Sequence, residues 1–260
     1  MISKEEQKIL EQLIRDAGTR LLQYWPGSSP KNRADTLSIT QKQDGSFVTK
    51  ADFESNEILI SGLKKLFPND GIFSEELARD ENLSQANRAW IIDPLDGTQS
   101  FIDGNDDFSI LLGLCVGEKI VFGMMYFPAR GLFARGFSTG GATLNGLLMK
   151  VSAVDSFRER AIYLRHIKLP EQAYFYDKWM DSGMAFLNLC RGELDGIILK
   201  LVHHQEWDLA APAVMIEESG GVISDEFGAP IRFKRSPVTT GYFVASNGKI
   251  HQRLLDLIPQ

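Results

Sequence analysis

Two aspartates three residues apart, Asp93 and Asp96, follow a short apolar run, Trp90-Ile91-Ile92. Pro94 lies between them and cannot donate a hydrogen bond to a neighbouring strand, so we expect the chain to turn where this buried strand ends. Two carboxylates this close repel each other unless a proton or a cation lies between them, and oxygen ligands suit a hard divalent ion. The pair therefore indicates a site for a divalent metal.

Gly97 and Thr98 come directly after the aspartates and could begin a helix. The first amide groups of such a helix would face the same point as the carboxylates. A metal beside a helix N-terminus is a site for phosphate, because unpaired amides and the helix dipole both favour an anion there. Asp-Pro and Asp-Gly are also ordinary turn dipeptides, so this segment alone is equally consistent with a loop without chemistry.

Further carboxylates lie at similar boundaries, where a predicted strand ends or a predicted helix begins. They are Asp52, Glu75-Glu76 and Asp208. Asp52 falls in the first turn of a helix that Thr49 can cap, where an acid also complements the helix dipole without any other role. The glutamate pair follows a short strand at residues 72–73, and successive strand residues point to opposite faces. We therefore expect only one glutamate of the pair to face a metal.

Together these motifs resemble those of the inositol monophosphatase superfamily, the magnesium-dependent, lithium-sensitive phosphatases. Residues 93–98 are similar to the first signature of that family, and residues 207–211 with Gly220-Gly221 behind them resemble the second. Residues 48–52 and Glu75-Glu76 fit the two upstream motifs in the expected order. Four motifs at plausible separations are far more specific than any one of them. The resemblance covers nearly the whole chain.

The resemblance implies roles for particular residues of this chain. The implied ligands of two Mg²⁺ ions are the side chains of Glu75, Asp93, Asp96 and Asp208 and the backbone carbonyl of Leu95. Thr98 would orient the attacking water, helped by Glu75 or, in a variant mechanism, by Asp52. The amides of Gly97 and Thr98 would hold phosphate oxygens. The full set of expected substrate contacts is Asp96, Gly97, Thr98, Asp208, Lys200 and His203.

A polar segment, residues 28–45, predicts a loop or short hairpin over the site. Family members bring a lysine and a third metal through a similar loop, and Lys42 is the nearest match in this chain. A solvated surface lysine explains Lys42 equally well. The resemblance thus implies two Mg²⁺ ions and allows a third.

Departures from the family pattern bear on the substrate. Ser100 stands where inositol phosphatases commonly carry Asn and bisphosphate nucleotidases carry Glu, so it supports neither. Inositol phosphatases typically place a glutamate shortly before the Trp-Asp motif, whereas this chain has Lys200 near that position. A pocket lined by Lys200 and His203 would lack an acceptor for polyol hydroxyls but could pair with a second anionic group. His203 and His204 are otherwise expected as surface residues at a strand end.

Composition limits the classes of protein. The 260 residues carry a net charge of -6, and the pI is near 5.3. This balance argues against a broad basic surface for nucleic acid or anionic lipid. No apolar run approaches membrane-spanning length, and no basic-then-apolar leader opens the chain, so we expect a cytoplasmic protein. Cys115 and Cys190 lie in apolar surroundings without metal-site spacing, which predicts two buried, reduced thiols.

Hydrophobic periodicity and caps predict the elements that must position these residues. Ser3 and Glu6 form a capping box for a first helix, and Thr49 caps a second. The remaining predicted helices are residues 184–190, 207–219 and 250–258. The predicted strands are residues 72–73, 108–116, 120–127, 132–137, 161–164, 194–199, 222–224 and 242–245.

The order of these elements predicts an α/β fold. The N-terminal half has the α+β pattern of an antiparallel sheet with two helices packed against it. The C-terminal half alternates strands and helices, which favours a mainly parallel sheet. The resemblance implies a layered αβαβα sandwich of the sugar-phosphatase type. We expect two sub-domains, 1–152 and 153–260, with the site in the cleft between them.

These observations predict a phosphomonoesterase that uses metal-activated water on a small phosphorylated metabolite of the inositol or sugar phosphate class. The resemblance also implies a homodimer. One alternative is a 3'(2'),5'-bisphosphate nucleotidase acting on 3'-phosphoadenosine 5'-phosphate, because residues 105–109 and Ala211-Pro212 resemble those enzymes. Another is a catalytically silent member of the family that binds a partner, or a metal-buffering protein. A serine or cysteine nucleophile is a weaker account, because no suitable base accompanies either cysteine.

Overall fold

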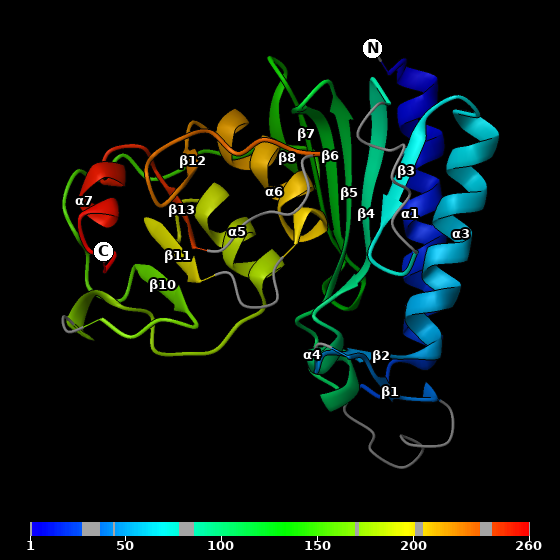
Figure 1. Ribbon diagram of the computed structural model, residues 1–260, viewed down its shortest axis with the longest axis horizontal. Helices are drawn as coiled ribbons and strands as arrows, with labels where there is room; N and C mark the ends of the chain where they lie inside the picture. The colour runs from blue at the N-terminus through cyan, green and yellow to red at the C-terminus, as the bar shows by residue number, and fades with distance from the viewer. Residues whose placement is uncertain are drawn as a thin grey trace.

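The computed structural model describes residues 2–27, 37–43, 45–77, 86–169, 172–200, 205–234 and 241–259. Its helices and sheets form successive layers (Figure 1). Helix α7 lies on one side of a four-stranded sheet, and α5 and α6 separate that sheet from a seven-stranded sheet. Helices α1 and α3 cover the outer face of the larger sheet. The predicted layered α/β sandwich is confirmed.

Each of the two outer helices, α1 (Lys4–Tyr24) and α3 (Lys50–Leu66), begins at a capping box. In α1 the Ser3 amide donates to Glu6 at 2.6 Å, and the Glu6 amide donates to the Ser3 hydroxyl at 3.2 Å. In α3 the corresponding residues are Thr49 and Asp52. Such reciprocal caps satisfy amides that the first helical turn leaves unpaired. Both predicted helices are confirmed.

The larger sheet runs in the order β3-β4-β5-β6-β7-β8-β9, and all neighbours are antiparallel except β3 and β4. Its strands are β3 (Gly71–Ser74), β4 (Arg88–Asp96), β5 (Ser109–Val116), β6 (Lys119–Phe127), β7 (Leu132–Phe137), β8 (Gly141–Leu144) and β9 (Leu147–Leu148). Short elements beside this sheet are β1 (Thr40–Gln41), β2 (Phe47–Val48), α4 (Thr98–Asp103) and the 3-10 helix η3 (Pro128–Arg130).

Strand β4 is apolar throughout because both of its faces are covered. Trp90 and Ile92 pack in the core under α1 and α3, whereas Ile91 packs in the core under α5 and α6. We expected this strand to end before Pro94. It instead continues to Asp96 through an irregularity in its pairing register with β5. Such an irregularity accommodates a residue that cannot donate to the ladder and re-aims the side chains around it.

The smaller sheet runs in the order β10-β11-β13-β12 and is mixed. Its strands are β10 (Ile162–Arg165), β11 (Gly196–Lys200), β12 (Val222–Asp225) and β13 (Tyr242–Ser246). The helical elements of this half are α5 (Ser182–Cys190), α6 (Glu206–Glu218), α7 (His251–Leu255) and the 3-10 helix η4 (Gln172–Tyr174). Only β10 and β11 are parallel, so the predicted mainly parallel sheet is wrong. Although α6 lies between β11 and β12 in sequence, it packs mainly on the larger sheet.

Helix α6 lies unusually close to the larger sheet because glycines face it. A Cβ atom at Gly113 would lie 2.8 Å from the Ala210 side chain, and one at Gly123 would lie 2.8 Å from Val214. Real Cβ atoms essentially never approach other atoms this closely, so only glycine permits this packing. The close approach holds α6, whose first turn carries Asp208, against β5 and β6.

Two further expectations concern the chain as a whole. Cys115 and Cys190 are buried free thiols, as predicted, and burial raises the pKa of each to about 12. Among the residues that the structure describes, no helix is both long and apolar enough to cross a lipid bilayer.

Candidate active site

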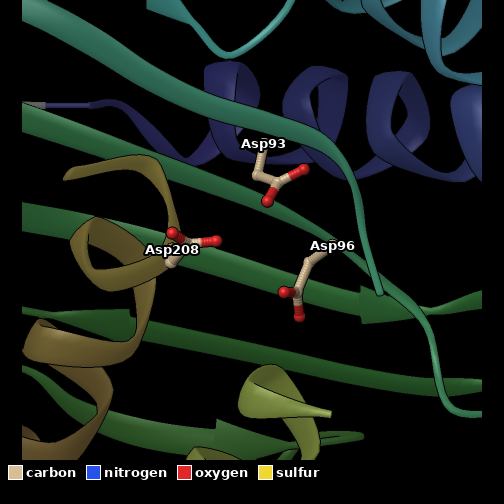
Figure 2. A group of neighbouring side chains, drawn as sticks. All are labelled: Asp93, Asp96 and Asp208. Carbon is tan, nitrogen blue, oxygen red and sulfur yellow. The ribbon is translucent and has the colours of Figure 1, made fainter. Parts of the chain in front are cut away.

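Three aspartates from two elements meet between the larger sheet and α6. Asp93 and Asp96 come from β4, and Asp208 comes from the first turn of α6. One carboxylate oxygen of each lies within 4.8 Å of the others, and Figure 2 shows the three side chains directed toward one another. Asp93 shares the strand face of Ile91, which is the face that α6 covers. The predicted convergence of these acids is confirmed.

The cluster is electrostatically unfavourable without a cation or a proton. Asp93 and Asp96 are only 2% and 4% exposed. Burial raises the pKa of Asp93 well above its usual value, and the charges of Glu75, Asp96 and Asp208 raise it further. Burial likewise raises the pKa of Asp208 to about 8. An all-oxygen, negatively charged set of this kind fits a hard divalent cation.

Glu75 and Glu76 both bind Lys42, which the hairpin of β1 and β2 carries into the site. The Lys42 ammonium donates to one oxygen of each glutamate at 2.7 Å. Burial lowers the pKa of Lys42, but the two ion pairs outweigh it, so the net shift is upward. Lys42 is therefore not a solvated surface lysine. Both carboxylates reach Lys42 beyond the end of β3 at Ser74, but of the two only Glu75 lines the cavity that holds the aspartates, so the expectation that one glutamate of the pair faces a metal stays a prediction.

Thr98 lies between Asp52 and the backbone of β4. Its hydroxyl oxygen is 3.1 Å from the Leu95 carbonyl and 3.2 Å from a carboxylate oxygen of Asp52. The other oxygen of Asp52 accepts from the Thr49 amide at 2.8 Å and from its hydroxyl at 2.6 Å. Asp52 therefore caps α3 and also contacts Thr98. Burial raises the pKa of Asp52 to about 7.

Gly97 joins β4 to α4, and its position accepts no side chain. Its φ is +85°, in the left-handed region that favours glycine. A Cβ there would lie 2.9 Å from the Asp107 carbonyl and 3.0 Å from the Asp181 carboxyl carbon. The helix begins at Thr98, as predicted.

A cavity of about 300 Å³ connects these groups. The predicted site residues that line it are Glu75, Asp93, Leu95, Asp96, Gly97, Thr98 and Asp208. Asp52 is not among its lining residues and reaches it only through Thr98. Lys200 is not among them either, since this residue is exposed at the end of β11 with its ammonium 6.0 Å from the Tyr242 ring centre. His203 lies outside the described residues.

The cavity also has a wall that the sequence motifs did not indicate. Its residues come from the end of β10 and the approach to α5, and they are Arg165, His166, Trp179, Asp181 and Ser182. Asp181 caps α5 by accepting from the Ser182 amide at 2.7 Å. An aspartate followed by two small residues ahead of an apolar helix is typical of an N-cap. This pattern is the sequence signal that could have indicated Asp181.

Helix α5 holds Asp96 in place from the C-terminal half of the chain. Asp96 accepts from the Gly183 amide at 3.1 Å, from the Ser182 hydroxyl at 3.2 Å and from the Ser109 hydroxyl at 3.0 Å. A Cβ at Gly183 would overlap this carboxylate. Burial raises the pKa of Asp96 well above its usual value, and neighbouring Asp181 raises it further. These contacts orient Asp96 toward the cluster without neutralising it.

Comparison with known proteins now adds to this geometry. Residues 3–260 match the pattern of the inositol monophosphatase family. The chain belongs to this family. An inositol-1-monophosphatase of Synechocystis is 30% identical over 265 residues, with 95% of this chain and 86% of that protein covered. A histidinol-phosphatase of Chlorobaculum parvum is 28% identical over 259 residues, with 95% and 94% covered.

The fold of this inositol monophosphatase family member also matches solved structures. SuhB of Bartonella henselae superposes with a TM-score of 0.81 at 24% identity, and the match covers 96% of this chain and 97% of that one. An IMPase of Thermotoga maritima gives the same TM-score at 23% identity, with 98% and 96% covered. Membership in the family assigns the chain to the phosphoric monoester hydrolases.

Proposed function

We propose that the protein is a magnesium-dependent phosphomonoesterase that hydrolyses a small phosphorylated metabolite with metal-activated water, in the inositol or sugar phosphate class. The observation that carries this proposal is the meeting of Asp93, Asp96 and Asp208, whose oxygens lie within 4.8 Å of one another in a pocket. Repulsion among these buried carboxylates lowers the stability of the folded protein, and bound cations would offset it.

The residues that would hold two Mg²⁺ ions are the three aspartates, Glu75 and the carbonyl of Leu95. All of these donors are oxygens, which is the set that Mg²⁺ prefers. When bound, Mg²⁺ polarises the phosphate and lowers the pKa of a bound water. A third ion remains part of this proposal, as do the homodimer and the cytoplasmic location; light scattering of the purified protein would test the dimer.

The role we propose for Thr98 is to orient the attacking water. When Asp52 is ionised, it accepts the hydrogen bond of the Thr98 hydroxyl, whose oxygen lies 3.2 Å away. The lone pairs of Thr98 are then free to accept a hydrogen bond from water, which turns the water oxygen toward phosphorus. Glu75 lines the cavity and is the second candidate to receive a proton from that water.

The phosphate would be held beside the start of α4. We assign its oxygens to the amides of Gly97 and Thr98, where the absence of a Cβ at Gly97 leaves the backbone accessible. Asp96 and Asp208 line the same cavity and would contact the substrate together with the metal. Lys200 stays a prediction without a contact to the cavity among the described residues.

A binding role in another class is the second candidate, because some relatives are not named as enzymes. Nus factor SuhB of Pseudomonas aeruginosa is 28% identical over 249 residues, with 87% of this chain and 88% of that protein covered. The complete acid cluster of this chain favours turnover over a silent role. A bisphosphate nucleotidase stays the alternative within the phosphatases.

The test is phosphate release from a panel of esters after the metal has been stripped with EDTA. The panel comprises inositol 1-phosphate, fructose 1,6-bisphosphate, histidinol phosphate and 3'-phosphoadenosine 5'-phosphate. We expect Mg²⁺ to restore hydrolysis of at least one ester, and the ratio of kcat/KM values to rank the substrates. No Mg²⁺-dependent release from any ester would contradict the enzyme and favour the binding role.

A further inference from the structure

The part of the cavity wall that the sequence motifs did not indicate is the part that the leaving group of the ester would contact. This inference rests on the proposed phosphatase function. With phosphorus beside the aspartate cluster, the rest of the ester must extend through the cavity toward its remaining lining. That lining includes Arg165, His166 and Trp179. None of these residues is needed to hold metal, so they are available to select the alcohol that leaves.

Trp179 is an exposed indole on an anchored segment. It is 56% exposed although it lines the cavity. The guanidinium carbon of Arg165 lies 5.6 Å from the centre of its ring, and Arg165 also donates to the Met180 carbonyl at 3.2 Å. The Tyr163 hydroxyl donates to the same carbonyl at 2.5 Å. The neighbouring backbone is therefore tied to β10 while much of the indole stays open.

The charged groups of this wall offset each other. Arg165 lies 3.8 Å from a carboxylate oxygen of Asp181, so its charge is offset by an acid. The other oxygen of Asp181 accepts from the amide of Ser182 at 2.7 Å and from its hydroxyl at 3.2 Å. A second phosphate would meet a cation whose charge Asp181 already offsets, although the buried Nε of Arg165 has no hydrogen-bond partner among the described residues. Trp179 is the large aromatic side chain of this wall, and more than half of it is exposed.

We propose that, among the esters tested for the phosphatase function, the preferred one has a leaving group with an aromatic ring that packs against Trp179, which ranks ring-bearing esters above inositol and sugar phosphates. Aromatic rings favour offset or edge-to-face contact with an indole, and such contact exceeds the value of the buried area alone. The ring lies away from phosphorus, so the contact is made equally in the ground state and the transition state. Its loss therefore raises KM more than it lowers kcat.

Two esters isolate the ring from other properties. 2-Phenylethyl phosphate and 2-cyclohexylethyl phosphate are both esters of primary alcohols, and they differ in the aromaticity of a six-membered ring. We expect the wild type to favour the phenyl ester by about threefold to tenfold in kcat/KM, the order that aromatic contact adds beyond the buried area. Trp179→Leu should bring the ratio within about twofold, mainly through KM, whereas Trp179→Phe should retain most of it.

Phe227→Leu is the matched control, because Phe227 is an aromatic residue that is 85% exposed outside this cavity. A wild-type ratio near one would overturn the proposal, and so would an unchanged ratio in Trp179→Leu. An equal loss of kcat on both esters in that variant would assign Trp179 a structural role instead. Calorimetric Kd values for both esters give the same ratio without turnover. A retained preference in Kd with no hydrolysis would count against the phosphatase proposal alone.

Discussion

The hydroxyl of Thr98 connects the helix cap at Asp52 to the cavity in which we propose that water reacts. Asp52 is fixed by Thr49 at the start of α3 and offers its remaining oxygen to Thr98. The acid stays behind the cavity wall, and only the hydroxyl reaches the cavity. A threonine in this position can be a cap or a positioning group, and substitution separates the two roles.

Thr98→Ala should lower kcat by about 10²-fold or more, because a group that positions the water is lost. The affinity for Mg²⁺ should change little, since the carboxylates are retained. Thr98→Ser keeps the hydroxyl and should keep most of the turnover. Steady-state kinetics at saturating Mg²⁺ measure both variants. Near wild-type turnover in Thr98→Ala would mean that another group positions the water.

At the scale of single residues, the motifs predicted the acids of the site but not the side chains that contact or surround them. Asp93, Asp96 and Asp208 could be recognised because carboxylates that directly follow apolar segments stand out in a sequence. The shared ion pair of Glu75 and Glu76 with Lys42 could not, because it depends on where the hairpin of β1 and β2 lies. Trp179 and Arg165 carry no motif and become neighbours of the cluster only through tertiary packing.

The elements place the acids through close packing of α6 on the larger sheet. Gly113 and Gly123 face α6 at distances that leave no room for a side chain. Two segments far apart in sequence, the end of β4 and the start of α6, are thereby held side by side. The position of Asp208 thus depends on strands that carry no site residue themselves.

Gly123→Ala should displace α6 and weaken metal binding. The new Cβ would lie 2.8 Å from Val214 and 3.0 Å from the Ala211 carbonyl, and the latter is backbone that cannot rotate away. Overpacking of this kind costs about 1–3 kcal/mol in the free energy of unfolding. We expect a lower Tm and a higher Mg²⁺ concentration for half-maximal activity.

Lys119→Ala is the control for that experiment, because Lys119 is an exposed residue at the start of the same strand. It should change neither quantity. If Gly123→Ala had wild-type stability and an unchanged Mg²⁺ requirement, the close approach of α6 would not be what fixes Asp208.

Most helices and strands followed from local sequence signals, since capping boxes, glycines and apolar runs act within a few residues. The direction of strands in the smaller sheet did not. Alternating strands and helices predict parallel pairing when each helix covers its own sheet, but α6 packs on the larger sheet. The extension of β4 past Pro94 was also missed, because an irregularity in the ladder has no local signature.

At the scale of the whole molecule, the cluster makes metal-free stability depend on pH. Burial raises the pKa of Asp93, Asp96 and Asp208 in the folded protein. The folded chain therefore binds more protons than the unfolded chain between the unfolded pKa of about 4 and the higher folded value. These acids thus make the free energy of unfolding fall as the pH rises through that window, toward about 8 for Asp208.

Asp96→Asn should remove part of this penalty. The amide oxygen of asparagine can still accept from Gly183 and Ser109, so the contact with the Gly183 amide of α5 is retained. Without metal, the variant should be more stable than the wild type at pH 8, and the difference should shrink as the pH falls toward 5. Urea denaturation in EDTA at several pH values measures it. A difference that grows as the pH falls would contradict the electrostatic account.

The central claim is that these carboxylates hold the metal that turnover requires, and a Mg²⁺ titration of phosphate release tests it directly. The comparison is the wild type with Asp93→Asn, since the one hydrogen bond that Asp93 accepts among the described residues comes from the Leu95 amide at 3.0 Å. Loss of a group that merely supports a metal ligand costs about 10–100-fold. Loss of a ligand should therefore cost at least about 100-fold at the Mg²⁺ concentration that saturates the wild type.

Asp195→Asn provides the control, because Asp195 is a buried aspartate that does not line the cavity and is held by Arg158 and Ser152. The account predicts Mg²⁺-dependent phosphate release in the wild type and in Asp195→Asn, with EDTA abolishing it, and a large loss in Asp93→Asn. Equal rates in all three proteins, or rates that EDTA leaves unchanged, would contradict it.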